Sequence, residues 1–469
     1  MAEPEKIPQE EVESDAFEEL YGVTEDLVDR VVDALDQEAA PEQIKAILEP
    51  LHSADIADLL EQLSAGNRER LIAVLGDDLD SEVWAYLDYS IREDIVDDLE
   101  TEQLAEIVTG LASDDAIDII EDLDEADQKE LLDAIPADDR AIYEKSLSYP
   151  EESAGRLMQR EVVTVPNFWT VGQTIDYMRD ERIELPDDFY NLVIVDPSHK
   201  PVGLVKLSKL LRTGRDAAVS NIMAEDMKII PATMDQEDAA FLFRQYGLVE
   251  APVVDEEEGG RLVGVITVDD IVDVLDEEYE EDILKMGGVK EDDFYSDILE
   301  TTRMRFSWLL VNLGTAIIAS LVIALFAATL EKVVALAILM PIVASMGGNA
   351  GTQTLTVAVR ALATNELTPS NALRIVGKEI IVGGLNGFLF AILMGLIAWG
   401  WFSDPALGAV IASAMIINLL VAGLAGTLIP LGLEKLGQDP AISSSVFLTT
   451  ITDVIGFFAF LGLAAWVLL

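Results

Sequence analysis

Residues Val333–Val359 read VVALAILMPIVASMGGNAGTQTLTVAV, a run that contains no charged residue. A helix needs about 20 apolar residues to cross the hydrocarbon layer of a membrane, so this run is long enough to span one. Four further apolar runs accompany it: Phe306–Leu330, Ile380–Phe402, Pro405–Leu433 and Ala441–Leu469. The sequence therefore predicts a five-span α-helical transmembrane domain over residues 306–469.

The quoted run is unusual for a membrane span because residues that loosen a helix stand beside polar amides. Pro341, Gly347 and Gly348 precede Asn349 and Gln353. Irregular backbone at membrane depth is tolerated only where it is buried in protein or lines a wet cavity. Close packing of small residues would explain the glycines but not the amides. We expect an interrupted helix whose residues Gly347, Gly348, Asn349 and Gln353 line a pore.

Asp453 is the single charged residue of the last apolar run. A carboxylate deep in a bilayer costs several kcal/mol and marks a cation or proton pathway more often than a structural role. Three hydroxyl residues, Thr449, Thr450 and Thr452, surround it in the sequence. A protonated or hydrogen-bonded structural Asp is the alternative. We interpret Asp453 as the acidic residue of a cation pathway.

Charge is distributed very unevenly along the 469 residues. The formal net charge is -57, yet the mean hydropathy is +0.29. Residues 306–469 hold only seven of the 87 acidic residues and five of the 30 basic ones, so residues 1–305 form an acidic soluble region. Nucleic-acid binding is excluded because it needs basic surface to neutralise phosphates. A salt-adapted surface would explain the overall acidity, but not where the carboxylates cluster.

The absence of cysteine excludes a disulfide scaffold and a thiolate metal site. The N-terminus is acidic and lacks a secretory signal. Basic residues such as Arg303, Arg374 and Lys435 fall on one side of the five predicted spans. By the positive-inside rule we expect a multi-pass membrane protein with a cytoplasmic N-terminus and the C-terminus outside.

The soluble region changes pattern along its length. Residues 1–19 are acidic and poor in large apolar side chains, which predicts a disordered tail. Over residues 20–150 apolar residues recur at helical spacing in similar short segments, which predicts a cytosolic all-α superhelical domain. Residues 151–275 alternate short strands with helices, and a connecting helix region, 276–305, leads to the membrane.

The α/β part, residues 151–275, contains two copies of a β-α-β unit and resembles a tandem pair of CBS domains. In such domains a Thr and an Asp after the glycine-containing strand can hold the phosphate and ribose of a nucleotide. Gly264, Thr267 and Asp270 are therefore candidate nucleotide-binding residues, with ATP as the candidate ligand. The first copy has lysines at the corresponding places, and CBS pairs that bind no nucleotide are common. A CBS pair that binds no ATP is therefore the alternative.

Residues 269–282, which read DDIVDVLDEEYEED, connect this pair to the membrane domain. Asp270, Asp273, Glu277 and Glu281 share one face of the predicted helix. Like charges arranged in this way destabilise a helix unless cations compensate them. A solvated helix face is the ordinary alternative to a cation-binding surface.

Several local motifs of the chain form a specific combination. They are Tyr149–Met158, Pro252–Asp255, Gly264–Asp270, Pro341 with Gly347–Gln353, Arg360–Ala363, Asp439–Ala441 and Thr449–Asp453. In this order, and from about residue 20 to the end, they resemble the MgtE family of magnesium transporters and channels. The chain departs from the family at Tyr246-Gly247, where Tyr-Asp is frequent, and at Ala327, where an acidic residue is frequent.

The resemblance implies a homodimer in the lipid bilayer of a prokaryotic plasma membrane, with a pore on its two-fold axis that is lined by spans two and five. It implies that Mg²⁺ enters the cell down its electrochemical gradient through a pore that contains Asp453. It further implies that the pore closes when cytosolic Mg²⁺ binds to the helical domain, the CBS pair and the connecting helix. The implied sensor residues are Glu82, Asp114, Asp118, Glu237, Asp270, Asp273, Glu278, Glu281 and Asp282.

Two alternatives remain at this point. One is a carrier or exporter of another divalent ion, such as Mn²⁺, Co²⁺ or Zn²⁺, although the lack of Cys and of a pore His argues against soft metals. The other is a membrane enzyme regulated by its CBS pair. An enzyme would need a second catalytic group near Asp453, where the sequence offers only hydroxyls and amides, so we expect no enzymatic activity.

Overall fold

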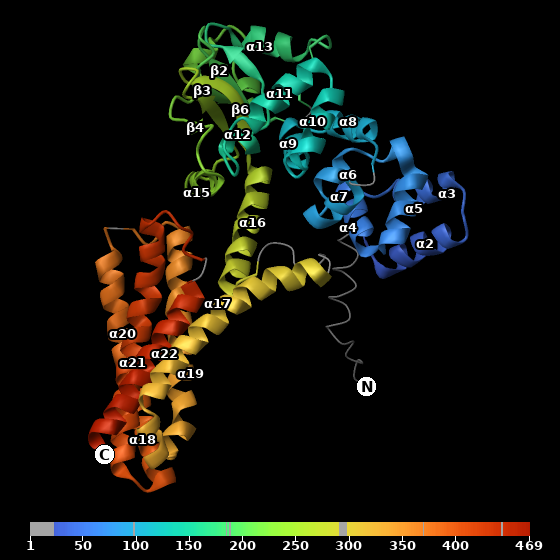
Figure 1. The fold of residues 1–469 in the computed structure, drawn as a ribbon. Coiled ribbons are helices and arrows are strands. Elements are labelled where there is room, and N and C mark those ends of the chain that lie inside the picture. The colour runs from blue at the N-terminus through green and yellow to red at the C-terminus, as the bar shows by residue number, and fades with distance from the viewer. Residues whose placement is uncertain are drawn as a thin grey trace, which may run out of the picture. The chain divides into compact units, whose positions relative to one another are not determined.

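The structure is a computed structural model that describes residues 23–96, 99–183, 185–186, 189–289, 298–368, 370–441 and 444–469. It contains two compact units, Met1–Leu275 and Asp276–Leu469, each of which is described by itself (Figure 1). The predicted tail, 1–19, lies outside the described residues, as does part of the predicted connecting region 276–305.

The first unit begins with short helices that share one apolar core. Their buried residues recur at helical spacing, as Leu27, Val31 and Leu35 do in the first of them. Thr24 caps that helix, because its side-chain oxygen accepts a hydrogen bond from the N–H of Leu27. The all-α prediction is confirmed. The helices are α2 Glu25–Asp36, α3 Pro41–Leu48, α4 Ser53–Gln62, α5 Ala65–Leu75, α6 Glu82–Ala85, α7 Tyr89–Val96, α8 Thr101–Gly110, α9 Ser113–Glu121, α10 Glu125–Ala134 and α11 Ala137–Leu147.

Two similar three-stranded sheets follow the short helix α12, Ala154–Leu157. In each sheet the first strand pairs parallel to the second, and the second pairs antiparallel to the third. The first copy consists of β1 Thr164–Pro166, α13 Val171–Met178, β2 Asn191–Val195, β3 Pro201–Lys206 and α14 Leu207–Leu211. The second consists of β4 Ile230–Pro231, α15 Gln236–Tyr246, β5 Glu250–Asp255, β6 Arg261–Thr267 and α16 Val268–Gly287.

The two sheets share more than strand order, which confirms the predicted tandem pair. Each has a register irregularity between its second and third strands, at Ile194/Val195 and at Val253/Val254. Apolar residues of both sheets, among them Val193 and Val265, form one small core. The second copy ends in the long helix α16, whereas α14 at the same place in the first copy has five residues.

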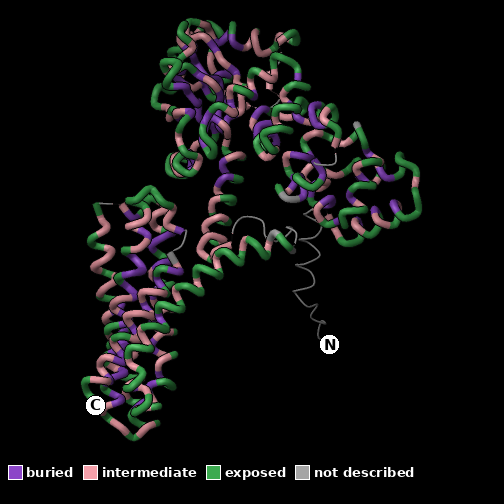
Figure 2. The backbone as a smooth tube through the Cα atoms, viewed as in Figure 1, coloured by how far each residue is buried: buried purple, intermediate pink, exposed green. Residues whose placement is uncertain are grey.

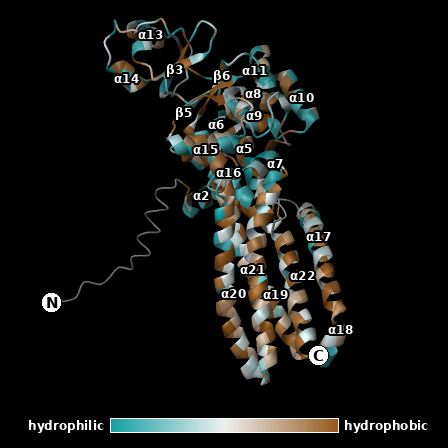
Figure 3. Ribbon diagram, turned by 90° about the vertical axis from the view of Figure 1, so that its left-hand side faces the viewer, coloured by the Kyte–Doolittle hydropathy of each residue, from teal (hydrophilic) through white to brown (hydrophobic). Residues whose placement is uncertain are grey.

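The second unit consists mainly of long apolar helices (Figure 3). Five are long and apolar enough to cross a membrane, which confirms the predicted number of spans over the described residues. The central one is α21, which packs against α19, α20 and α22 and has the most buried residues (Figure 2). The helices are α17 Ile298–Leu325, α18 Ala327–Lys332, α19 Ala335–Ala363, α20 Ala372–Phe402, α21 Pro405–Lys435 and α22 Ser444–Val467.

The predicted interruption of the second span is wrong, because α19 is continuous through Pro341 and its glycines. A glycine lowers helix stability by about 1 kcal/mol, but packing overrides so small a preference. Gly347 and Gly351 lie on the face that α21 and α22 cover, where added Cβ atoms would collide with Asn418 and Leu448. Small-residue packing, the alternative considered for this run, therefore accounts for both glycines.

Several predicted span boundaries also differ from the structure, as two examples show. The third span begins at Ala372 instead of Ile380, because its helix continues through the charged residues Lys378 and Glu379. The first span ends at Leu325, where Phe326 separates α17 from the short helix α18. Hydropathy locates the apolar centre of a helix well and its polar ends poorly.

Candidate functional site: membrane polar residues and an acidic cluster

Asp453 lies on α22 within a candidate membrane span, Ser445–Val467. Its side chain is half-buried and makes no hydrogen bond or ion pair with any residue that the structure describes. The neighbouring hydroxyls do not donate hydrogen bonds to this carboxylate, because Thr449, Thr450 and Thr452 all donate to backbone carbonyls of their own helix. The carboxylate therefore has no internal counter-charge in this part of the chain.

Helix α19 presents a polar face beside its packed glycine face. Asn349 and Gln353 are exposed, and the Nδ2 of Asn349 donates to the Oγ of Ser345 at 3.4 Å. An added Cβ at Gly348 would meet nothing, whereas Gly347 is buried. Ser345, Asn349, Thr352 and Thr356 recur at helical spacing and are all exposed in the single chain, which is costly in lipid.

Glu379 is a membrane carboxylate that sequence reasoning missed, because the third span was placed from Ile380 onward. It lies two turns inside α20, and its side chain is only 14 % exposed. Its Oε2 accepts a hydrogen bond from the Oγ1 of Thr354 on α19 at 3.3 Å, and the Nζ of Lys378 lies 3.8 Å from its Oε1. Asp453 is therefore not the only acidic residue within the membrane helices.

Several predicted sensor residues meet in the first unit, where α9 faces the start of α16. Burial, followed by the charge of Asp270, raises the pKa of Asp114 well above its ordinary value. The same two causes raise the pKa of Asp115 to about 7. Burial raises the pKa of Asp270 to about 6, even though the hydroxyl of Thr267 donates to its carboxylate at 2.6 Å. The three carboxylates are half-buried and like-charged neighbours, which accounts for the direction of these pKa shifts.

Glu82 and Asp273 lie at the edge of the same cluster, near Tyr86. Burial raises the pKa of Tyr86, and the charges of Glu82, Asp115 and Asp273 add to this effect. Among the described residues, no three carboxylates or imidazoles stand close enough to hold a metal ion in this arrangement. The cluster is therefore a concentration of negative charge without a preformed metal site.

Asp118 is held by a cation of the protein itself. The buried guanidinium of Arg92 on α7 contacts Asp118 at 2.7 Å and Asp122 at 2.5 Å. Asp118 lies in the second half of α9 and Asp122 is the C-cap residue of that helix, so Arg92 fixes α7 against α9. Glu237 lies apart from this group, in the first turn of α15.

The remaining predicted sensor residues lie in the second unit, on the last turns of α16. The Nζ of Lys285 pairs with Glu281 and lies 2.9 Å from Asp439, which belongs to the segment between α21 and α22. Burial, followed by the charge of Asp439, raises the pKa of Asp282 to about 6. Sequence reasoning quoted Asp439 in a motif but gave it no role. Glu278 lies one turn before Asp282 on the same helix.

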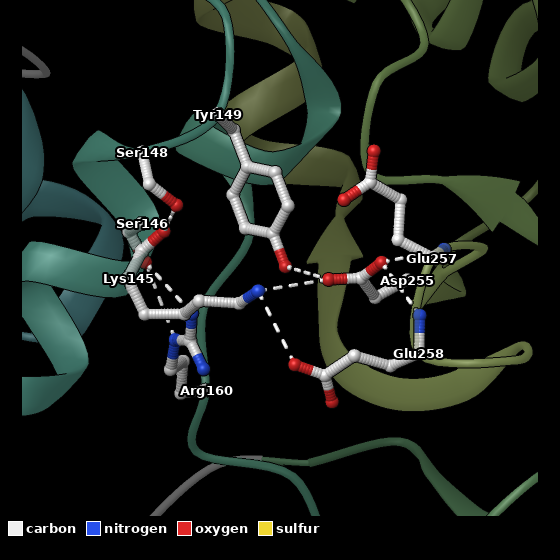
Figure 4. A network of polar contacts seen from close by, with 8 residues as sticks. All are labelled: Lys145, Ser146, Ser148, Tyr149, Arg160, Asp255, Glu257 and Glu258. Carbon is white, nitrogen blue, oxygen red and sulfur yellow. Dashed lines mark hydrogen bonds and ion pairs between the residues drawn. The ribbon is translucent and has the colours of Figure 1, made fainter.

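A polar network joins the helical domain to the second CBS copy within the first unit (Figure 4). The buried carboxylate of Asp255 accepts hydrogen bonds from the Nζ of Lys145 at 2.9 Å and the hydroxyl of Tyr149 at 3.0 Å. The backbone N–H groups of Glu257 and Glu258 donate to its other oxygen. Burial alone would raise the pKa of Asp255, but the hydrogen bonds from Lys145 and Tyr149 lower it below the ordinary value.

The structure places the candidate nucleotide residues at the end of β6. An added Cβ at Gly264 would lie 2.6 Å from the carbonyl oxygen of Gln159, so this glycine is explained by packing within the chain. The backbone N–H and the hydroxyl of Thr267 both donate hydrogen bonds to the Oδ2 of Asp270. Their role toward a nucleotide stays a prediction.

Comparisons with known proteins agree with this organisation. The sequence model described as a divalent cation transporter matches residues 340–463. The model of the MgtE intracellular N domain matches residues 51–152, and the CBS domain model matches 154–216 and 219–277. Two solved structures, titled as the soluble part of a magnesium transporter and as the cytosolic domain of the Mg²⁺ channel MgtE in complex with ATP, are 22% and 29% identical, each with a TM-score of 0.48. They cover 54% and 53% of this chain, and the chain covers 98% and 99% of them.

Curated relatives extend over nearly the whole chain. The magnesium transporter MgtE of Thermus thermophilus is 32% identical over 435 residues, which are 91% of this chain and 96% of that protein. The MgtE of Bacillus subtilis is 29% identical over 421 residues, 90% of this chain and 93% of that protein. The family consists of transporters and not of enzymes. With the same order of helical domain, CBS pair and membrane helices, the chain belongs to the MgtE family of divalent cation transporters.

Proposed function

We propose that this protein is a Mg²⁺-selective channel that takes up Mg²⁺ down its electrochemical gradient. The curated relatives are named as magnesium transporters. The observation that carries the proposal is Asp453, a carboxylate on a membrane helix without an internal counter-charge among the described residues. A cation passing along α22 is the partner that such a group requires.

The pore forms between two copies of the chain, with α19 and α22 of both lining it. The polar face of α19, which includes Asn349 and Gln353, supports this arrangement, because lipid would not solvate it. Two Asp453 carboxylates would then face one ion. Mg²⁺ loses water reluctantly, so a wide site of carboxylates, amides and carbonyls recognises it with much of its hydration shell in place.

Cytosolic Mg²⁺ closes the channel through the acidic cluster. Asp114, Asp115 and Asp270 repel one another in the absence of a cation, and their desolvation increases the repulsion. Mg²⁺ binding would remove this repulsion and hold α9 against α16. Helix α16 continues without a break to Asp282 and Lys285, so a change at its first turns reaches the residues that contact Asp439. Regulation then follows from Mg²⁺ preferring the closed state.

Mg²⁺ flux into proteoliposomes tests the proposal. Asp453→Asn keeps the size of the side chain and removes its charge, so we expect a folded protein without Mg²⁺ permeation. The matched control is Glu331→Gln, which neutralises an exposed carboxylate at the end of α18. Wild-type Mg²⁺ uptake by Asp453→Asn would refute the proposed pathway.

A further inference from the structure

Asn418 is a fully buried amide at the centre of the membrane domain. It lies on α21, and its exposed fraction is 0%. Its Nδ2 donates to the backbone carbonyl of Val343 on α19 at 2.8 Å. Its Oδ1 is also buried and has no hydrogen-bond partner among the described residues. An unpaired buried acceptor is unfavourable, so an apolar side chain of this size would be the more stable choice for packing alone.

Two glycines leave the space that this amide occupies. A Cβ added at Gly456 on α22 would lie 2.8 Å from the Nδ2 of Asn418 and 3.1 Å from its Oδ1. A Cβ added at Gly347 on α19 would lie 2.7 Å from the Cγ of Asn418. The amide therefore fills the junction of three helices, and neither neighbour tolerates a side chain there.

The two helices that Asn418 touches are those of the proposed cation pathway. Gly456 follows Asp453 by three residues, so Asn418 contacts α22 within one turn of the pore carboxylate. The hydrogen bond to Val343 binds the turn of α19 that contains Gly347 and precedes Asn349. The hydrogen bond of Asn418 to α19 and its close contact with Gly456 on α22 limit how far either of these two helices can rotate.

We propose that Asn418 is a positioning residue for ion recognition, which fixes the relative rotation of α19 and α22 and thereby the orientation of Asp453. The proposal rests on the proposed function, since it assumes that the ion passes Asp453. It accounts for an amide at a buried membrane position whose Oδ1 has no hydrogen-bond partner among the described residues. It also accounts for the glycines at positions 347 and 456.

The first test measures Mg²⁺ flux of the full-length protein in proteoliposomes, with Ca²⁺ as the competing ion. Asn418→Leu removes the hydrogen bond at similar size. We expect its discrimination between Mg²⁺ and Ca²⁺ to fall by about tenfold, the usual effect of losing a group that orients a metal ligand. The control is Ser413→Ala, which removes an exposed hydroxyl that bonds within α21. A variant that melts earlier but keeps wild-type discrimination overturns the proposal.

The second test does not depend on the folding of the leucine variant. Gly347→Ala forces a methyl group against the amide, so it should impair discrimination in the wild-type background. In an Asn418→Ala background the amide that the methyl group would strike is absent, so Gly347→Ala should reduce the discrimination between Mg²⁺ and Ca²⁺ little further. Gly432→Ala, where an added Cβ meets nothing, is the control. Equal effects of Gly347→Ala in both backgrounds overturn the proposal, whereas wild-type uptake by Asp453→Asn would refute the pathway instead.

Discussion

At the scale of single residues, Asp255 shows how one carboxylate can hold two domains of the first unit together. One of its oxygens accepts hydrogen bonds from Lys145 and Tyr149, and the other accepts from two backbone N–H groups, so both carboxylate oxygens are satisfied. Lys145 is itself about one-third exposed, with 37% of its side-chain surface accessible, so water screens part of that ion pair. The network is therefore strong because several donors share one buried acceptor.

We expect Asp255→Asn to destabilise the first unit by about 2 kcal/mol, since hydrogen bonds to a charged group are lost and an amide N–H₂ would face Lys145. The loss should be measured by pulse proteolysis in urea. Glu257→Gln, which changes the adjacent exposed carboxylate, is the matched control. Because the pKa of Asp255 lies below its ordinary value of 3.8 when folded, its contribution is complete above that value and is lost as the pH falls through the lower folded pKa. A difference between wild type and variant that is constant down to strong acid would contradict this account.

At the scale of elements, α16 is the helix whose own acidic side chains most oppose helix formation by repelling one another. Many of its residues are acidic, and Lys285 is the basic residue of its last turn. The proposed sensor residues Asp270, Asp273, Glu278, Glu281 and Asp282 all lie on it. A helix with this charge distribution is under repulsion that a divalent cation would relieve.

Changing those five residues to Asn or Gln should abolish the dependence of open probability on internal Mg²⁺. The substitutions remove both the cation ligands and the repulsion that favours opening, so the direction of the basal change is not fixed. The control variant changes Glu10, Glu11, Glu13, Glu18 and Glu19 to Gln, which neutralises the same number of acidic residues in the tail. Single-channel recording at varied internal Mg²⁺ measures the effect. The same Mg²⁺ dependence in both variants and wild type would leave salt adaptation as the explanation of the acidity.

The elements that could be predicted from the sequence are those that local patterns determine. Five apolar runs gave the five membrane helices, and repeated strand motifs gave the two sheets. The prediction failed at Gly347, because glycine lowers helix preference locally while the partner that requires it, Asn418, lies 71 residues away in the sequence. Helix ends such as that at Ala372 were misplaced for a related reason, since charged residues extend a helix beyond its apolar centre.

The candidate site was predictable only in part. Asp453 stood out because a charge in an apolar run is visible in the sequence itself. Asn418 was equally visible within its run but was overlooked, because an uncharged amide carries a weaker signal. The proximity of Asp114 to Asp270 depends on how α9 meets α16, and only the resemblance to the MgtE family indicated it before the structure did.

At the scale of the whole molecule, the five candidate spans of the described residues place the two ends of the chain on opposite sides of the membrane. Basic residues such as Arg303, Arg374 and Lys435 lie in the connections on the side of the N-terminus, and the positive-inside rule places such connections in the cytoplasm. We therefore propose a cytoplasmic N-terminus and an external C-terminus.

The absence of native cysteine makes this orientation directly testable, because one introduced thiol reports one location. Leu469→Cys places the thiol at the exposed C-terminus, and Gln438→Cys places it at an exposed position in the segment between α21 and α22. A membrane-impermeant maleimide added to intact cells should label the first and spare the second. Permeabilised cells, in which both should react, control for accessibility. Labelling of Gln438→Cys but not of Leu469→Cys in intact cells would reverse the orientation, and would place the acidic cluster where it could not sense cytosolic Mg²⁺.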